Sequence, residues 1–177
     1  MFSLTQDWGK RIEELFSALK KSIKGTGSET KFLALHLRCG DSWKKWSDGL
    51  NYYTLEEMLR ARDRLVKEKK LKNVKTVVFS DKKGLESSDD YFLFSDYLNT
   101  TDSIEWVNDL LEIYLMSKFD ILIRPMSTYS GWAEYIGGID LVGEVGLKDK
   151  GWDERRKKKE EFTLKVTDKG EEYRLLF

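Results

Sequence analysis

Apolar residues along the chain follow two different patterns. Short, nearly uninterrupted apolar runs indicate buried strands, which we expect at 31–37, 74–80, 119–124 and 139–145. Apolar residues three or four positions apart predict helices, which we expect over 53–70, over 103–118 and from Ser127 onward. Alternation of strand and helix is typical of a parallel sheet with helices on both faces. The pattern therefore predicts an α/β, Rossmann-like domain.

Both ends of the chain add elements to this domain. An amphipathic helix that ends at the Gly-rich segment 25–28 is predicted by the apolar residues Phe2, Leu4, Trp8, Ile12, Leu15, Phe16, Leu19 and Ile23. The tail begins with a run of charges and continues with two strand-like segments around Lys169 and Gly170, which predicts a charged helix followed by a β-hairpin. We expect residues 1–150 to form the main domain and residues 151–177 a C-terminal extension.

Composition narrows the class of protein. The chain of 177 residues has 31 Lys and Arg against 31 Asp and Glu, so no net charge attracts nucleic acid or an anionic membrane. No apolar run reaches transmembrane length, and the N-terminal helix carries charges throughout, so we expect no membrane span and no signal peptide. One cysteine excludes an internal disulfide and a cysteine-based metal site. This favours a reducing compartment, and we expect the protein to be cytoplasmic.

Polar residues follow the expected strands where open α/β sheets bind their ligands. These residues are Arg38, Asp41, Ser80, Asp81, Arg124, Ser127 and Thr128. The guanidinium of Arg38 is a planar fork suited to a phosphate or a carboxylate, or else it pairs with Asp41 and closes its own loop. His36 shares a strand face with Arg38, and it is either a core residue or a residue beside the crevice.

The segment 124–132, RPMSTYSGW, strengthens the case for a ligand. Ser127, Thr128 and Ser130 supply hydroxyls where the free N–H groups of a new helix are expected, a combination that binds anions or serves as an ordinary helix cap. Asp81 either accepts hydrogen bonds from a ribose or a base, or caps the helix that follows it. Three polar strand ends at one edge of the sheet indicate a nucleotide.

Three segments resemble the motifs of fucosyltransferases. HLRCGD at 36–41 is similar to the His-x-Arg-Arg-Gly-Asp motif of α-1,2-fucosyltransferases and, more distantly, of α-1,6- and protein O-fucosyltransferases. VVFSD at 77–81 resembles their Phe-Ser-Asp strand. The stretch 111–136, LEIYLMSKFDILIRPMSTYSGWAEYI, resembles their long signature, in which a Leu-Met-Ser helix leads to a strand and then to Asn-Ser-Thr-Phe-Ser-Trp-Trp-Gly. The three occur in the family's order with suitable gaps.

This resemblance implies the donor-binding half of a GT-B glycosyltransferase that uses GDP-fucose, inverts the sugar carbon and needs no metal or other cofactor. By analogy Arg38 grips the diphosphate and acts in catalysis, Asp81 reads the guanine, and His36 lies against the nucleotide. The substrate-binding residues expected in this way are His36, Arg38, Ser80, Asp81, Arg124, Ser127, Thr128 and Ser130. Consistent with metal-free chemistry, the sequence contains no Asp-x-Asp pair of the kind that holds a metal and a nucleotide sugar.

The sequence also departs from the family. The motif's second Arg is Cys39, its Asn is Met126, its first Trp is Gly131, and the Gly after the second Trp is Ala133. Only residues 1–30 precede the first expected strand, where the family places an acceptor-binding domain. We therefore expect the acceptor site to come from a second domain, a partner subunit or another copy, or from the aromatic-rich loop 39–52.

Two classes of function remain open. The first is a GDP-sugar-dependent glycosyltransferase that transfers fucose to a hydroxyl of a glycan acceptor. Arg38 and Asp41 are its expected catalytic residues, and the position of Asp41 and Asp48 makes both of them candidates for the general base. The second is a catalytically inactive nucleotide-binding or assembly module derived from such an enzyme. A phosphate-ester hydrolase fits less well, because no nucleophile motif or metal cluster accompanies the strands.

Overall fold

The structure is a computed structural model that describes residues 6–25, 27–39, 52–100, 109–147 and 162–176. Four expectations concern residues outside these ranges. They are the start of the N-terminal helix at Phe2 and Leu4, the loop with Asp41 and Asp48, the first residues of the helix expected over 103–118, and the charged helix of the tail. Within the described ranges, no helix is both long and apolar enough to cross a membrane.

One seven-stranded sheet organises the chain, in the order β3-β2-β1-β4-β5-β6-β7. Its strands are β1 (Lys31–Leu37), β2 (Val74–Ser80), β3 (Phe92–Leu93), β4 (Ile121–Pro125), β5 (Leu141–Leu147), β6 (Phe162–Asp168) and β7 (Glu171–Leu176). The first five pair in parallel, and β6 and β7 pair antiparallel. The parallel part has the strand order of a Rossmann-like half. The expected fold class is confirmed.

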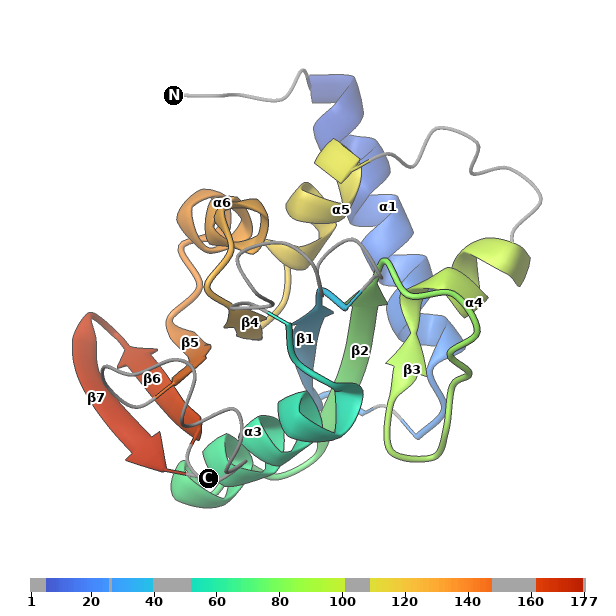
Figure 1. Cartoon of the computed structure of the whole chain (residues 1–177). Helices are drawn as coiled ribbons and strands as arrows, with labels where there is room; N and C mark the ends of the chain where they lie inside the picture. The colour runs from blue at the N-terminus through green and yellow to red at the C-terminus, as the bar shows by residue number, and fades with distance from the viewer. Residues whose placement is uncertain (1–5, 26, 40–51, 101–108, 148–161, 177) are drawn as a thin grey trace.

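Helices cover both faces of the sheet (Figure 1). They are α1 (Gln6–Ser22), α3 (Leu55–Glu68), α4 (Phe94–Thr100), α5 (Asp109–Met116) and α6 (Thr128–Gly137). α3 packs on one face over Leu33, Leu35 and Leu37 of β1, while α1, α4, α5 and α6 form the core on the other face with Ala34 and Phe32. Successive β1 residues point to opposite faces, so an almost continuous apolar run is what a strand covered on both sides requires.

The amphipathic N-terminal helix belongs to this core. One face of α1 is buried, with the side chains of Ile12, Leu15, Phe16 and Leu19. Ile23, the residue just after the helix, is buried as well. The ring centre of Phe16 lies 5.1 Å from that of Phe119, two residues before β4. Burial of such side chains supplies about 1.5–3 kcal/mol each, so α1 is an integral part of the described fold.

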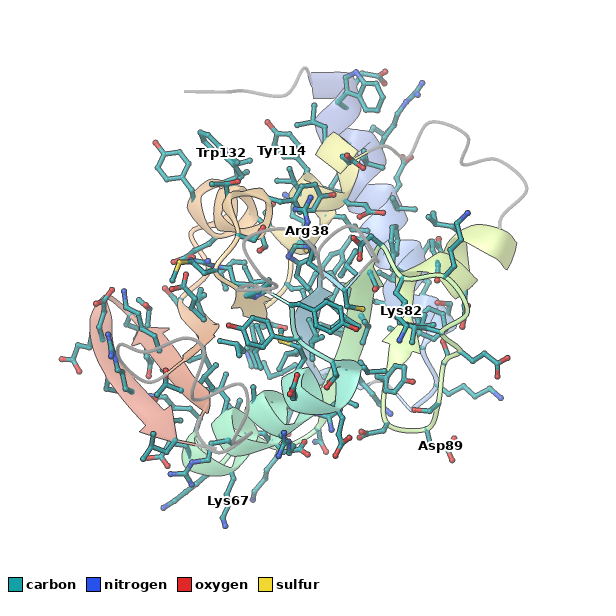
Figure 2. All side chains as sticks on the ribbon, viewed as in Figure 1. Arg38, Lys67, Lys82, Asp89, Tyr114 and Trp132 are labelled. Atoms are coloured by element: carbon teal, nitrogen blue, oxygen red, sulfur yellow. The ribbon has the colours of Figure 1, made fainter. Side chains whose placement is uncertain are left out.

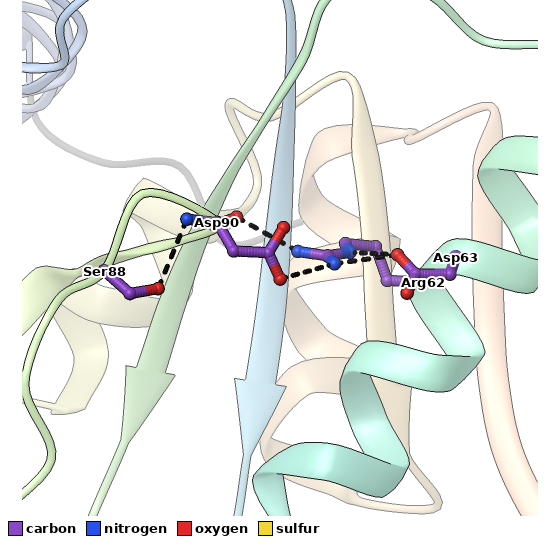
Figure 3. A network of polar contacts seen from close by, with 4 residues as sticks. All are labelled: Arg62, Asp63, Ser88 and Asp90. Carbon is purple, nitrogen blue, oxygen red and sulfur yellow. Dashed lines mark hydrogen bonds and ion pairs between the residues drawn. The ribbon is translucent and has the colours of Figure 1, made fainter.

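Arg62 is a charged residue on the buried face of α3. It is only 7% exposed, and its Nη1 and Nη2 bond the carbonyl and the carboxylate of Asp90 at 3.0 and 2.8 Å (Figure 3). Its Nε donates to Asp63 at 2.9 Å, and the N–H of Asp90 donates to Ser88 Oγ. A buried charge is tolerated only when it is paired in this way. The network therefore ties α3 to the connection between β2 and β3.

The C-terminal hairpin is confirmed and extends the main sheet through β5. Its turn uses Lys169 and Gly170, both with positive φ (49° and 86°), as a two-residue turn between strands requires. The ammonium of Lys69, at the end of α3, pairs with Asp168 and lies 4.8 Å from the ring centre of Tyr173. These contacts hold the hairpin against α3. The expected boundary near residue 150 lies outside the described ranges.

Two elements were not expected from the sequence. The stretch 92–100 forms the short strand β3 and the helix α4, which the apolar pattern did not distinguish. Phe94 and Tyr97 of α4 are buried, and the Phe94 ring lies 4.8 Å from Phe79 of β2. Only two residues of β3 pair with β2. A strand this short has no recognisable apolar pattern, so the sequence did not predict it.

Candidate functional site

A cavity of about 190 Å³ lies beyond the carboxyl ends of β1 and β2. It is lined by His36, Arg38, Phe79, Ser80, Asp81, Asp109, Glu112 and Tyr129. A larger hollow of about 650 Å³ lies at the opposite edge, beside the residues that begin β1, β4 and β5. We take the smaller cavity as the candidate site, because open α/β sheets bind ligands at the carboxyl ends of their strands. All three segments that resemble fucosyltransferase motifs contribute to it.

Arg38 stands at the end of β1 and faces the start of α6 (Figure 2). Its guanidinium carbon lies 5.4 Å from the ring centre of Tyr129, within cation–π range. Its Nη1 lies 3.5 Å from the hydroxyl of Ser127, the N-cap residue of α6. The side chain is therefore half-buried and held beside a helix N-terminus, where its charge reinforces the positive end of the helix dipole.

His36 is buried against the same tyrosine. Its ring centre lies 5.2 Å from that of Tyr129, and its Nδ1 has no hydrogen-bond partner within the described ranges. Burial, together with the positive charges of Arg38 and Arg124, lowers the pKa of His36 to about 3. The imidazole is therefore neutral at physiological pH. Both alternatives for His36 hold in part, since the ring is buried and also lines the cavity.

The N-terminus of α6 keeps polar groups available. Ser127 has the extended backbone of an N-cap, but its side chain makes no capping hydrogen bond. The first backbone bond of the helix runs from the N–H of Gly131 to Ser127, and the N–H groups before it lack acceptors within the helix. The hydroxyl of Ser130 is fully buried without a partner in the described part of the chain. Thr128 is exposed on the first turn. An ordinary side-chain cap therefore does not explain these hydroxyls.

Ser80 and Asp81 line the cavity and also support its backbone. The Oδ1 of Asp81 accepts a hydrogen bond from the N–H of Cys39 at 3.0 Å, which fixes the chain just after Arg38. The hydroxyl of Ser80 accepts from the N–H of Lys82 at 3.1 Å. One carboxylate oxygen of Asp81 thus braces the end of β1. Asp81 serves the site at least by positioning the neighbouring strand end.

Arg124 does not line the cavity, and neither do Ser127, Thr128 or Ser130, although all four were expected in the site. Its Nε and Nη2 donate to Glu134 of α6 at 3.0 and 2.7 Å, and its Nη1 lies 2.5 Å from Glu144 of β5. Two carboxylates therefore pair with this guanidinium. The arrangement holds α6 against β4 and β5, and it leaves Arg38 as the arginine that borders the cavity.

Three polar residues of the site, Asp109, Glu112 and Tyr129, had no role in the sequence-based expectations. The hydroxyl of Tyr129 has the carbonyl of Asp109 at 2.8 Å and Glu112 Oε2 at 3.2 Å as acceptors, so its single proton is shared between them. Burial raises the pKa of the Glu112 carboxyl, and the nearby Asp109 carboxylate adds to this effect. The available signals were a tyrosine inside a run of hydroxyl residues and a carboxylate in the apolar helix DLLEIYLM.

Taken together, the cavity has the cationic Arg38, which lies beside the N-terminus of α6, and acceptor groups around Glu112. Such a site suits a ligand with an anionic part and an N–H donor part. No group of three or more His, Cys, Asp or Glu that would hold a metal ion occurs among the described residues. The expected catalytic Asp41 lies outside the described ranges.

Comparison with known proteins gives similarity in fold only. No protein-family profile and no curated protein matches the chain in sequence. A solved structure of NodZ α-1,6-fucosyltransferase soaked with GDP-fucose is 18% identical (TM-score 0.47), and the match covers 94% of this chain and 49% of that one. Fucosyltransferase NodZ from Bradyrhizobium is 20% identical (TM-score 0.46), with 90% and 47% covered. The chain thus spans about half the length of these fucosyltransferases.

Proposed function

We propose that the chain is the donor-binding part of a glycosyltransferase that moves fucose from GDP-fucose to a glycan hydroxyl with inversion. The proposal rests on three segments that resemble motifs of fucosyltransferases, most closely the α-1,2 group. In the fold these segments, far apart in the sequence, supply residues to one cavity at the carboxyl ends of β1 and β2. A chance resemblance in one segment would not explain why all three meet there.

The observation that carries the proposal is a pair of buried polar atoms without partners within the described ranges, His36 Nδ1 on β1 and Ser130 Oγ on α6. His36 packs against Tyr129 in the first turn of α6, and Ser127, the N-cap of that helix, lies beside Arg38. Buried polar groups are otherwise almost always hydrogen-bonded, so these atoms indicate a ligand. An anion fits them best, since helix N–H groups, an arginine fork and hydroxyl groups all donate hydrogen bonds to phosphate oxygens. We assign the diphosphate to this position.

The acceptor groups of the cavity suit the base of the nucleotide. Guanine carries adjacent N–H donors, which a carboxylate oxygen pair accepts. Glu112 and Asp81 both line the cavity, and one oxygen of Asp81 accepts from the N–H of Cys39. A volume of about 190 Å³ is below the ~300–1,000 Å³ typical of ligand pockets, so it accommodates part of the nucleotide.

In the proposed reaction the bond between the sugar carbon and the diphosphate oxygen breaks, and its electron pair stays on the diphosphate. An acceptor hydroxyl oxygen forms the new bond from the opposite side and loses its proton to a base, for which we propose Asp41. Arg38 and the N-terminus of α6 favour this step, because they are in place before negative charge grows on the leaving group. They would supply the charge stabilisation that a metal supplies in other transferases.

Calorimetry with GDP in excess EDTA tests the donor site, and GDP release from GDP-fucose tests turnover. We expect binding that EDTA does not weaken. Binding that disappears in EDTA and returns with Mg²⁺ would refute the metal-free site. Binding of GDP without any turnover, even with a panel of glycan acceptors, would favour the alternative of a nucleotide-binding or assembly module. Failure to bind GDP under either condition would refute both.

The glycan acceptor and the protein that completes its site remain part of the proposal. We propose that a second domain, a partner subunit or another copy supplies the acceptor site in a reducing compartment such as the cytoplasm.

A further inference from the structure

Tyr129 touches both the basic and the acidic part of the candidate site. Its ring stacks beside His36 (centres 5.2 Å apart, planes at 33°) and lies under the Arg38 guanidinium at 5.4 Å. Its hydroxyl reaches from α6 to α5, where its proton is shared between the carbonyl of Asp109 at 2.8 Å and the carboxylate of Glu112 at 3.2 Å. Within the described part of the cavity, Tyr129 is the residue that contacts Arg38 and Glu112 together.

The ring of Tyr129 restricts where Arg38 can go. An arginine has many rotamers in water, and each one lost on binding costs affinity. A guanidinium over an aromatic face is attracted by the ring and loses part of its freedom. The Tyr129 ring, 5.4 Å from the guanidinium carbon, therefore helps to hold Arg38 beside Ser127 at the N-terminus of α6.

The hydroxyl of Tyr129 affects the protonation of Glu112. Glu112 is half-buried, and the charged or titratable groups around it are Asp109 on its own helix, Tyr129 on α6, His36 and Arg38 at the end of β1, and Asp81 after β2. Burial and the Asp109 charge raise the pKa of Glu112, and the Tyr129 hydrogen bond opposes them. Without that bond, the carboxyl is protonated at higher pH and loses an acceptor.

We propose that Tyr129 is a positioning residue that prepares both parts of the nucleotide site, orienting Arg38 with its ring and keeping Glu112 an ionised acceptor with its hydroxyl. The inference rests on the proposed nucleotide-binding function. In that site Tyr129 would also contribute to base specificity, because an ionised Glu112 favours bases with N–H donors. A phenylalanine would perform only the first of the two tasks.

The hydroxyl is tested without any ligand by following the Glu112 carboxyl in ¹³C NMR, in the wild type and in Tyr129→Phe. We expect the pKa of Glu112 to be higher in the variant, with the same thermal melting profile. Glu112→Gln identifies the resonance. An unchanged or lower pKa of Glu112 in Tyr129→Phe would overturn the inference, whatever the protein binds.

The effect on binding is tested by calorimetry with GDP and with guanosine between pH 5 and 8.5. Loss of one hydrogen bond should weaken both ligands about five- to tenfold in Tyr129→Phe. The decline in affinity toward acid should begin at higher pH than in the wild type. In the Glu112→Gln background, Tyr129→Phe should change little, since a coupled pair is not additive.

The ring is tested by Tyr129→Leu, which removes the support under Arg38 as well as the hydroxyl. We expect it to weaken GDP more than guanosine, relative to Tyr129→Phe, because guanosine has no phosphate for Arg38 to hold. Equal losses for the two ligands, or additive effects with Glu112→Gln, would overturn the positioning role. Wild-type protein that binds neither ligand would refute the proposed function and this inference together, whereas normal GDP binding by Tyr129→Phe would refute the inference alone.

Discussion

The imidazole of His36 lies against the ring of Tyr129, with 5.2 Å between the ring centres, and its Nδ1 is buried without a partner among the described residues. A polar nitrogen in this position costs free energy unless something bonds it. The pair therefore marks a place where the fold tolerates an unmet hydrogen bond, as ligand sites do.

His36 is the only histidine of the chain, so its titration can be followed directly by NMR. Its pKa is lowered from 6.5 to about 3 by burial and by two arginines, and we expect no titration between pH 5 and 8. As the pH falls, the unfolded chain takes up a proton on His36 before the folded chain does. The free energy of unfolding is therefore unaffected by His36 above about pH 6.5 and decreases from there toward pH 3, by about 1.4 kcal/mol per pH unit. His36→Asn should flatten that slope. An imidazole that titrates near pH 6.5 in the folded protein would contradict this prediction.

Arg38→Lys keeps the charge but removes the planar fork, and it also weakens the stacking on Tyr129. We expect GDP affinity to fall by about 1.5–3 kcal/mol, the worth of a charged hydrogen bond, with little change in melting temperature. Calorimetry and a thermal melt measure the two quantities. Arg174→Lys, on the exposed side of β7, is the matched control. Unchanged affinity, or unfolding without ligand, would return Arg38 to a purely structural role.

Arg62→Ala removes the buried guanidinium that joins α3 to Asp90. We expect the free energy of unfolding to fall by about 1.5–3 kcal/mol. This is less than for a fully buried ion pair, because Asp63 and Asp90 are largely exposed and stay solvated when the guanidinium is removed. Urea unfolding measures the loss. Arg60→Ala, two positions earlier and exposed, should change stability by less than about 0.5 kcal/mol. Equal effects of the two substitutions would show that the network contributes nothing specific.

Two glycines of α6 should respond oppositely to alanine. A Cβ at Gly137 would lie 2.2 Å from the carbonyl oxygen of Ser117, so Gly137→Ala must push α6 away from the end of α5 and should cost about 1–3 kcal/mol. At Gly131 a Cβ would meet nothing within 4 Å, and Gly131→Ala should stabilise the helix by about 0.5–1 kcal/mol. Thermal unfolding distinguishes them. The same sign for both variants would contradict the close contact of α5 and α6.

Much of the fold could be predicted from local patterns. The bounds expected for β1 and β2, 31–37 and 74–80, are those observed, because strands buried on both faces need continuous apolar runs. The hairpin turn at Lys169 and Gly170 followed from turn chemistry within a few residues. The position of Arg38 at a strand end followed from β1 alone. For these features, the physical cause lies within a short stretch of chain.

Only the tertiary structure decided which polar side chains meet. Arg124 looked equivalent to Arg38 as a residue at the end of a strand, yet Glu134 and Glu144 from two other elements occupy it. Tyr129 and Glu112 entered the site because α5 and α6 pack together beside β1, and β3 formed because β2 exposed an edge. Hydrophobic periodicity reports which face of an element is buried, but the partners of a side chain depend on the register and packing of segments far apart in the sequence.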